Sequence, residues 1–370
     1  MHILHVYKDY FPILGGIENH IRLLAEAQAA LGHEVTVLVC APDRHTSEEQ
    51  HNGVHVIKAG RLATVASMPL SWRQPLILAT LQPDIAHIHS PYPLGEVANW
   101  VWGRARATVI TYHSDIIRQR MILCLYGPIL RRVLYAANTI IATSSHYLES
   151  SPWLRPMRDR CVVVPLGIDL SRFTVPARYL HTPPVLLFVG RLRYYKGLDT
   201  LLHAMPHIPQ ARLVIVGDGP MRNTWQRLAV RLGLEPRVQF VGEVPDCELP
   251  RYYADADLFV LPANARAEAF GTVLLEAMAT GLPVISTELG TGTSWVNQDG
   301  VTGRIVPPND PDALAAAIRE LLANPGQLVQ MGRAARARVE AEFSLPVMVQ
   351  RVETVYRQVL SRLDTGRVKS

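Results

Sequence analysis

The second half of the chain contains the stretch Arg266-Ala-Glu268-Ala-Phe270-Gly271-Thr272-Val-Leu-Leu-Glu276. The preceding run, 257–261, is apolar and stops at a proline, which is typical of a buried parallel strand. After the turn, 273–279 consists of good helix formers and ends before Gly281, where a left-handed C-cap suits glycine. The pattern predicts a strand, a loop and a helix that begins near Gly271.

A helix that begins near Gly271 would favour a bound anion. The first backbone N–H groups of a helix have no partner within it, and the helix dipole attracts negative charge. Glycine has no side chain to keep a phosphate from the backbone. Glu276, inside the helix, is then placed to accept hydrogen bonds from the hydroxyls of a ribose. A capped surface helix with two solvated acids is the alternative interpretation.

The stretch resembles the E-x7-E motif of the retaining glycosyltransferases of family four. The resemblance extends to the Arg-x-Glu-Ala-Phe-Gly context and to Gly281-Leu-Pro-Val-Ile beyond the helix. It implies that Glu268 contacts the transferred sugar and that Glu276 binds the ribose of the nucleotide. The diphosphate would lie against the backbone of the residues between them, Phe270, Gly271 and Thr272.

Composition excludes several other classes of protein. The 370 residues are 48% hydrophobic and 19% charged, which is ordinary for two globular domains. A formal net charge of +5 suits acidic ligands such as nucleotides but does not indicate nucleic-acid binding. The four cysteines form no C-x-x-C pair, and no apolar run has the length of a membrane span. With no signal peptide visible, we expect a cytoplasmic protein.

The first half alternates apolar strands with helices. A strand over 3–6 leads through Gly15-Gly16 into a helix over 17–31, and further strands are predicted over 35–40, 54–57, 85–89, 108–112, 138–143 and 161–164. This alternation is typical of a mostly parallel sheet covered on both faces. Gly15 and Gly16 lack the spacing of a dinucleotide fingerprint, and a flexible turn explains them equally well. The family resemblance implies that their loop lies near the sugar diphosphate and the acceptor.

Three histidines lie at or near the ends of predicted strands. His113 follows the strand over 108–112, at the edge where parallel sheets bind ligands, and imidazole suits hydrogen bonding or acid–base chemistry. The resemblance implies that His113 faces the transferred sugar. His87 and His89 share one face of a strand, but the sequence shows no third ligand beside them, so we expect no metal site.

The segment 116–135 is apolar and basic. It carries Arg118, Arg120, Arg131 and Arg132 without an acid, and a break at Gly127-Pro128 predicts two short helices. Such a segment suits an anionic membrane surface or a lipid-pyrophosphate acceptor. A helix that packs on the sheet and leaves its arginines in water is the alternative.

A domain boundary is predicted where regular periodicity stops and two prolines precede a new apolar strand over 185–189. We assign 1–170 to an acceptor-side domain and 171–345 to a nucleotide-sugar-binding domain. The family resemblance implies that 346–370 forms a helix that returns to the first domain.

Arg191 and Lys196 lie in a glycine-bracketed loop after the strand over 185–189. Both can reach a diphosphate and stabilise the negative charge that a leaving nucleotide gains. We recognise no aspartate-x-aspartate element, and therefore expect no metal cofactor. Solvated surface cations are the alternative interpretation. The resemblance also implies that the backbone around Val244 borders the nucleotide base.

The resemblance covers nearly the whole chain, because the His113, Arg191 to Lys196 and Glu268 to Glu276 motifs arrive in family order. It implies an α/β architecture of the GT-B type, two Rossmann-like domains that face each other across a cleft. We expect a retaining hexosyltransferase of the mannosyl or rhamnosyl kind, with GDP-sugar as donor and UDP-sugar as the alternative. The acceptor would be a glycan or lipid-pyrophosphate, at the inner face of the plasma membrane. A GT-B nucleotide-sugar epimerase and a non-catalytic sugar-nucleotide sensor are alternatives of other classes.

Overall fold

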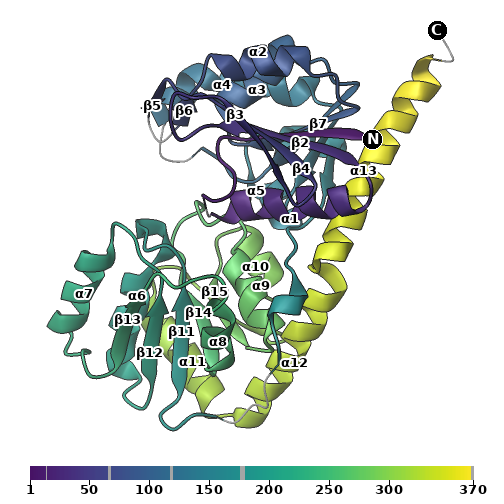
Figure 1. The fold of residues 1–370 in the computed structure, drawn as a ribbon. Helices are drawn as coiled ribbons and strands as arrows, with labels where there is room; N and C mark the ends of the chain where they lie inside the picture. The colour runs from purple at the N-terminus through teal and green to yellow at the C-terminus, as the bar shows by residue number, and fades with distance from the viewer. Residues whose placement is uncertain (14, 66–67, 117–119, 176–179, 368–370) are drawn as a thin grey trace. The chain divides into compact units, whose positions relative to one another are not determined.

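The computed structural model describes residues 1–13, 15–65, 68–116, 120–175 and 180–367. The chain forms two units, one of Met1–Leu166 with Leu345–Ser370 and the other of Gly167–Ser344 (Figure 1). We call them unit 1 and unit 2. Unit 1 therefore contains both ends of the chain, and the strands restart in unit 2 after the two prolines at 183 and 184.

Unit 1 is built on an eight-stranded sheet in the order β10-β9-β8-β7-β1-β2-β4-β3. Its strands are β1 (His2–Val6), β2 (Glu34–Cys40), β3 (Ser47–His51), β4 (Val54–Ala59), β7 (Ile85–Ser90), β8 (Ala107–Tyr112), β9 (Thr139–Ala142) and β10 (Cys161–Val163). The named pairs are parallel except β3 with β4. Strand order reverses between β1 and β7, where ligands of such sheets bind beyond the carboxyl ends. A separate hairpin pairs β5 (Ala63–Val65) with β6 (Met68–Leu70).

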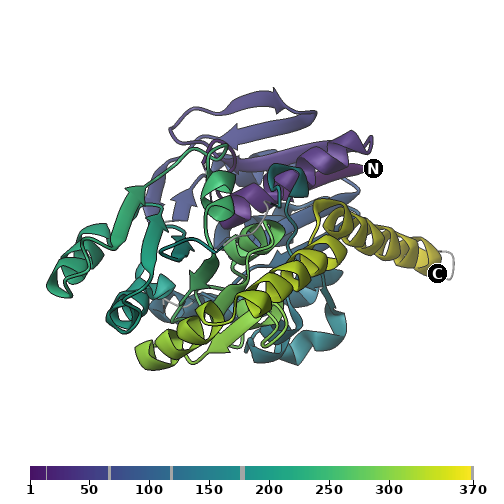
Figure 2. The same cartoon turned by 90° about the horizontal axis from the view of Figure 1, so that it is seen from below.

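Helices cover both faces of this sheet. Figure 1 shows one layer made of α2 (Arg73–Thr80), α3 (Pro93–Trp102) and α4 (Arg120–Ala136), and α1 (Gly16–Ala30) on the opposite face. The last helix, α13 (Leu345–Arg367), packs beside α1, and it is drawn as one long yellow helix in Figure 2. The short helices of this unit are α5 (Ser145–Ser150) and the 3-10 helix η1 (Arg155–Arg160).

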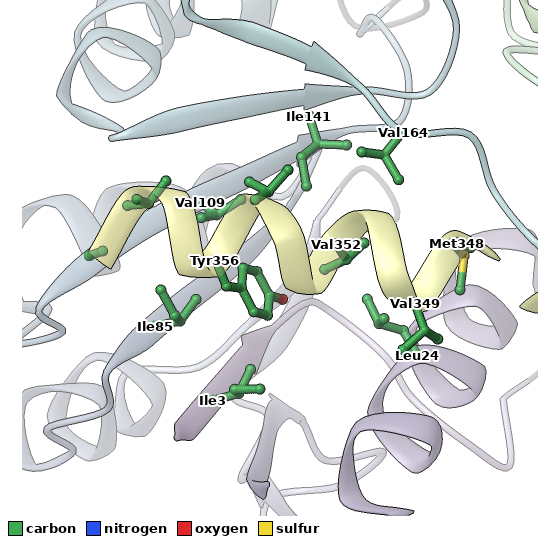
Figure 3. Close-up of a cluster of buried hydrophobic side chains, with 13 residues drawn as sticks. Ile3, Leu24, Ile85, Val109, Ile141, Val164, Met348, Val349, Val352 and Tyr356 are labelled. Atoms are coloured by element: carbon green, nitrogen blue, oxygen red, sulfur yellow. The ribbon is translucent and has the colours of Figure 1, made fainter. Parts of the chain in front are cut away.

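Helix α13 completes the core of unit 1. Its apolar side chains point toward strands β1, β7, β8 and β9 and toward α1 (Figure 3). The buried members that it contributes are Met348, Val349, Val352, Val355, Tyr356 and Val359, each no more than 5% exposed. Burial of one such side chain stabilises a fold by roughly 1.5–3 kcal/mol, so the last helix is a structural part of the first unit.

Helix α4 differs from the prediction of two short helices. A single helix runs from Arg120 to Ala136 with Pro128 inside it, so that prediction is wrong for the described residues. Proline removes one hydrogen bond from a helix, but the buried side chains of Leu130 and Leu134 hold this helix on the unit. The Trp153 ring packs directly against Gly127, where a β-carbon would lie only 2.9 Å from the ring. Arg118 lies outside the described residues.

Unit 2 is built on a six-stranded sheet in the order β13-β12-β11-β14-β15-β16, and its pairs are parallel. Its strands are β11 (Val185–Val189), β12 (Arg212–Val216), β13 (Val238–Gly242), β14 (Leu258–Leu261), β15 (Val284–Thr287) and β16 (Gly303–Val306). Strand order reverses between β11 and β14, so the loops after these two strands meet at the switch point of the sheet.

The helices of unit 2 form two groups. One group packs together as α6 (Leu198–Ala204), α7 (Arg222–Arg231) and α11 (Pro311–Leu322), and the other as α8 (Leu249–Ala254), α9 (Thr272–Ala279), α10 (Gly292–Val296) and α12 (Pro325–Glu342). Three 3-10 helices are η2 (Leu170–Arg172), η3 (Tyr194–Lys196) and η4 (Met205–His207). Among the described residues of both units, no helix combines the length and hydropathy that a membrane span requires.

Candidate functional site

The loop after β11 is fixed to the loop after β14 at the switch point of unit 2. Gly197 has a left-handed φ of 62°, and a side chain there would collide with the carbonyl oxygen of Pro262. The Asn264 N–H donates to the Tyr195 carbonyl at 2.9 Å. Glycine is therefore required by both its conformation and this close approach.

Lys196 and Glu268 form a buried ion pair at this point. Lys196 Nζ lies 2.7 Å from Glu268 Oε2, and the two side chains are only 9% and 11% exposed. The lysine stem runs beside Gly190, where a β-carbon would lie 3.3 Å from Cε. The sequence predicted both residues as functional, and the structure brings them into direct contact.

Arg191 shares the loop with Lys196 but has a different environment. It directly follows Gly190, whose φ is 149°, and its side chain is exposed. The loop therefore offers one exposed guanidinium and one buried ammonium at the carboxyl end of β11. Such a pair can bind an anion without giving up the ion pair to Glu268.

The glutamate motif is supported by the loop after β15. Thr291 Oγ1 donates to the Glu268 carbonyl at 3.0 Å, and the Gly292 N–H donates to the Ala269 carbonyl at 2.7 Å. Arg266 Nη1 donates to the carbonyls of 289 and 290 at 3.3 and 3.2 Å. No pattern in the sequence placed this loop against Glu268.

Phe270 and Gly271 contribute through the backbone. The Phe270 side chain is buried, and its ring centroid lies 6.3 Å from that of Phe343. Gly271 has a left-handed φ of 79°, caps α9 and is followed by Thr272 as the first helical residue. The predicted helix start is confirmed, and a bound group at this point would meet main-chain N–H groups.

Glu276 lies within α9 and accepts a hydrogen bond from the Tyr253 hydroxyl at 2.6 Å. Burial raises the pKa of the Glu276 carboxyl above its ordinary value, and the Tyr253 hydrogen bond opposes that shift. Tyr253 lies on α8 and packs edge-on against Phe173. No sequence pattern marked Tyr253 as a partner of Glu276. Val244 is half-buried in the segment between β13 and α8.

The expectation that the chain lacks an Asp-x-Asp element is wrong, because Asp255 with Asp257 and Asp310 with Asp312 have this spacing. One member of each pair has a structural role. Asp257 precedes β14, and its Oδ2 accepts from the Val185 N–H at 2.7 Å, at the amino end of β11. Asp310 is the N-cap of α11 and accepts from the Ala313 N–H at 2.8 Å. Asp257 therefore lies at the amino edge of the sheet, opposite the edge that carries Lys196 and Glu268.

The unit 1 residues gather at the carboxyl edge of its own sheet. His113 directly follows β8 and is 3% exposed, and its N–H donates to the Ser90 carbonyl at 2.9 Å. Gly15 is the N-cap of α1, and the Glu18 carboxylate folds back over it. His20, further along α1, lies edge-on to His113 with 5.2 Å between ring centroids. The structure thus brings the Gly15-Gly16 loop and His113 together through His20.

Buried histidines extend from His113 across the sheet. His89 lies beside His113, and His5 on β1 is aligned with His87 on β7. Burial lowers the pKa of His5 to about 4 and that of His20 to about 3. It also lowers the pKa values of the His87, His89 and His113 rings well below the ordinary value. These rings are neutral at neutral pH.

Two groups of three histidines have nitrogens within 4.8 Å of one another, namely His5, His87, His89 and His20, His89, His113. A third histidine beside His87 and His89 was not visible in the sequence, and the register of β1 with β7 supplies His5. The nitrogens of His5 and His89 are already within hydrogen-bond distance of each other and of further partners. Hydrogen bonds between the rings therefore link His5, His89 and His113.

Two family models match the chain. "Glycosyltransferase Family 4" matches residues 14–172, and "Glycosyl transferases group 1" matches residues 176–338. The two matches follow the division into units.

Curated relatives cover nearly the whole chain. The D-rhamnosyltransferase WbpZ of Pseudomonas aeruginosa is 38% identical over 93% of this chain and 92% of its own length. The O-antigen chain mannosyltransferase C of Escherichia coli is 35% identical over 97% of this chain and 99% of its own length. A GDP-mannose-dependent phosphatidylinositol monomannoside mannosyltransferase of Mycolicibacterium smegmatis is 29% identical over 90% of this chain and 92% of its own length.

A solved structure supports the fold. The sucrose-phosphate synthase of Thermosynechococcus elongatus superposes with a TM-score of 0.80 at 25% sequence identity, over 98% of this chain and 99% of its own.

Proposed function

The chain belongs to the family 4 glycosyltransferases, which are also described as group 1 and have the GT-B fold, and we propose that it transfers a mannose- or rhamnose-type hexose with retention. The donor in this proposal is a nucleotide diphosphate sugar, and the acceptor is a glycan or a lipid-pyrophosphate. The observation that carries the proposal is the buried Lys196–Glu268 pair at the switch point of unit 2, beside the start of α9.

Each group at this point has a part in the proposed transfer. The diphosphate lies between the Arg191 and Lys196 cations and the N-terminus of α9. The bond from the anomeric carbon to the diphosphate oxygen breaks, the acceptor oxygen bonds to the same carbon, and the acceptor proton passes to the leaving phosphate. Lys196 and Arg191 stabilise the charge that the diphosphate gains. Glu268 holds Lys196 and contacts the sugar, and we propose that no metal cofactor is needed.

GDP is the proposed nucleotide. Support comes from the relatives, which are named as rhamnosyl- and mannosyltransferases and, in one case, as GDP-mannose-dependent. The test is incubation with GDP-mannose, GDP-rhamnose, UDP-glucose and UDP-galactose, with and without a mannose-containing oligosaccharide. Acceptor-dependent release of GDP supports the proposal, and release of UDP supports the other donor class. Turnover of the donor without an acceptor indicates an epimerase or a hydrolase, and binding without turnover indicates a sensor.

We expect Glu276→Ala to weaken nucleotide binding by about 1–3 kcal/mol, because a charged acceptor for the ribose hydroxyls is removed. Tyr253→Phe should have a smaller effect in the same direction, since Tyr253 holds the Glu276 carboxylate in place. Titration calorimetry with GDP measures both changes. Glu235→Ala is the control, because Glu235 is exposed elsewhere in unit 2. Unchanged affinity in Glu276→Ala would remove the ribose assignment.

The helical layer α2–α4 of unit 1 is proposed to touch an anionic membrane. Figure 1 shows these helices side by side on one face of the sheet. The layer exposes three tryptophans, Trp72, Trp100 and Trp102, which are 59%, 43% and 49% exposed. Arg131 and Arg132 of α4 are exposed on the same layer. Tryptophans and arginines together are typical of a surface that lies in a membrane interface.

We expect Arg131→Glu with Arg132→Glu to weaken co-sedimentation with phosphatidylglycerol vesicles at least tenfold at low salt. Each basic residue near an anionic surface contributes about 1 kcal/mol, and salt screens the effect. The control is Arg155→Glu with Arg158→Glu, because these exposed arginines lie on η1 of the same unit. If the wild-type protein does not sediment with the vesicles, the arginines form a solvated face.

A further inference from the structure

A continuous row of buried polar side chains crosses unit 1. It runs from Glu353 on α13 through Gln28 on α1, His5 on β1 and His89 on β7 to His113 after β8, and each residue is no more than 3% exposed. Successive partners lie 3.2, 2.8, 3.1 and 3.1 Å apart. We call these five residues the histidine row. Buried polar groups at such distances are hydrogen-bonded, so the direction of each bond can be worked out.

The direction is set at the Glu353 end. Glu353 Oε2 accepts from His33 Nε2 at 2.9 Å and lies 4.0 Å from Arg357 Nη2, and both neighbours suit a carboxylate. A carboxylate only accepts hydrogen bonds, so Gln28 must turn its NH₂ group toward Glu353 Oε1. The amide carbonyl of Gln28 then faces His5. The oxygen and nitrogen of a glutamine amide are usually hard to tell apart, but here the Glu353 carboxylate decides which end of the Gln28 amide is nitrogen.

The donor and the acceptor in each histidine hydrogen bond follow in the same way. His5 Nε2 must carry a proton in order to donate to the Gln28 carbonyl. Burial lowers the pKa of His5 to about 4, so the ring is neutral and its Nδ1 is an acceptor. His89 Nε2 therefore donates to His5 Nδ1, and His113 Nε2 donates to His89 Nδ1. Since burial also keeps the pKa values of His89 and His113 well below the ordinary value, each ring carries one proton.

The row ends in an acceptor that has no partner. His113 Nδ1 is buried and has no hydrogen bond within the described residues. It lies at the carboxyl edge of β8, where α1 brings the edge of the His20 ring beside it. A hydroxyl group can donate a hydrogen bond to the unprotonated nitrogen of a neutral imidazole. A deprotonated phosphate oxygen has no proton to donate, so its lone pairs would face the lone pair of this nitrogen.

We propose that the one-way hydrogen bonds of the histidine row fix His113 in its Nε2–H tautomer, so that Nδ1 accepts a hydrogen bond from a hydroxyl of the bound sugar. Glu353, Gln28, His5 and His89 are positioning residues in this arrangement. The tautomer follows from the row itself, and only the identity of the hydroxyl group rests on the proposed function.

The test of the tautomer is nuclear magnetic resonance of the full-length protein with ¹⁵N-labelled histidine. Long-range ¹⁵N–¹H correlation distinguishes a protonated from an unprotonated ring nitrogen. We expect protonated Nε2 and unprotonated Nδ1 for His5, His89 and His113. Glu353→Asp keeps a carboxylate and should keep this pattern.

Glu353→Gln provides the sharpest comparison. His33 and Arg357 would attract the carbonyl of the new amide, so its NH₂ group would face Gln28 and turn that amide round. Every donor in the row would then become an acceptor, and His113 should show a second or dominant signal set with Nδ1 protonated. Thr111→Val is the control, because Thr111 bonds to His87 outside the row. Thermal unfolding of each variant identifies any that fails to fold.

The role toward sugar is tested by adding GDP-mannose or GDP to the labelled protein. We expect GDP-mannose, and not GDP, to shift the His113 Nδ1 resonance. If neither compound binds, the proposed function fails and the tautomer result still stands. The inference is overturned by a wild-type His113 with protonated Nδ1, by a Glu353→Gln spectrum identical to wild type, or by zinc bound to these histidines.

Discussion

Replacing Lys196 by alanine is expected to slow sugar transfer by roughly 100- to 1000-fold, as the loss of other preorganised charge stabilisers does. The ammonium lies 2.7 Å from Glu268 and is largely shielded from water, so solvent cannot take its place when the diphosphate leaves. Donor affinity should change much less, because most of the negative charge develops in the transition state. Turnover and nucleotide affinity are measured on the same protein preparation.

Stability must be separated from catalysis at this position. Removing one member of a buried ion pair leaves the other without a partner, and this costs about 3–5 kcal/mol of folding free energy. The double variant Lys196→Met with Glu268→Gln removes both charges, so it should recover stability without recovering turnover. Arg191→Ala is the complementary test, because Arg191 is exposed and its loss should slow transfer at unchanged melting temperature. If Lys196→Ala and Arg191→Ala both keep wild-type turnover, the proposed role of the two cations is wrong.

The transfer assay in the presence of a chelator tests the proposed metal-free mechanism. Arg191 and Lys196 supply the positive charge in that proposal, so transfer should persist in EDTA. A reaction that stops with the chelator and resumes with magnesium or manganese would contradict it.

Acidification from pH 7.5 to 5 is expected to unfold unit 1 before unit 2. Five buried histidines in unit 1, His5, His20, His87, His89 and His113, have pKa values that burial lowers below 6.5. Between 6.5 and these lower values, the unfolded chain binds protons that the folded unit does not. Stability is therefore complete above about pH 6.5 and falls as the pH drops toward the folded-state values.

The expected loss is large compared with the stability of a domain. Each histidine contributes about 1.4 kcal/mol per pH unit, so His5 and His20 alone amount to about 4 kcal/mol at pH 5. Whole domains are stable by roughly 5–15 kcal/mol. Glu96 changes the stability of unit 1 in the opposite direction. Burial raises its pKa, so protonation of its carboxyl at lower pH stabilises the folded unit. This is one group, whereas five histidines destabilise the unit.

Hydrogen exchange read by mass spectrometry follows the two units separately. Peptides from β1, β7 and β8 should lose protection near pH 5 while peptides from β11 and β14 keep it. His20→Leu should move the transition to lower pH, since neither ring nitrogen of His20 has a partner among the described residues. His203→Leu is the control, because His203 is exposed on α6. Full protection of unit 1 down to pH 4 would contradict the prediction.

Several elements could be predicted from local sequence to within a residue or two. Strand β11 spans Val185–Val189 as expected, because an apolar run lies between Pro184 and Gly190. Helix α9 begins after Gly271 and is closed by Gly281, both with left-handed φ. In these places the turn chemistry of glycine and proline agrees with the hydrophobic pattern.

Other elements could not be predicted, because their cause is a partner distant in sequence. Strand β3, Ser47–His51, is polar and exposed, and it is held by antiparallel pairing with β4 and by an ion pair of 2.7 Å between Lys58 and Glu49. Gly303 begins β16, a strand that the sequence pattern did not predict. A side chain at Gly303 would collide with the Val284 carbonyl of β15.

The sequence by itself determined the alternation of strands and helices, the order of the motifs and the glycines that open the backbone to a ligand. These follow from the helical and strand periods and from turn geometry, which act over a few residues. The tertiary structure alone decided which motifs meet. Strand order puts β11 beside β14 and so brings Lys196 to Glu268. The packing of α13 in unit 1 brings Glu353 to Gln28, 325 positions away. The apolar face of α13 is buried against strands and a helix that come from the first half of the chain.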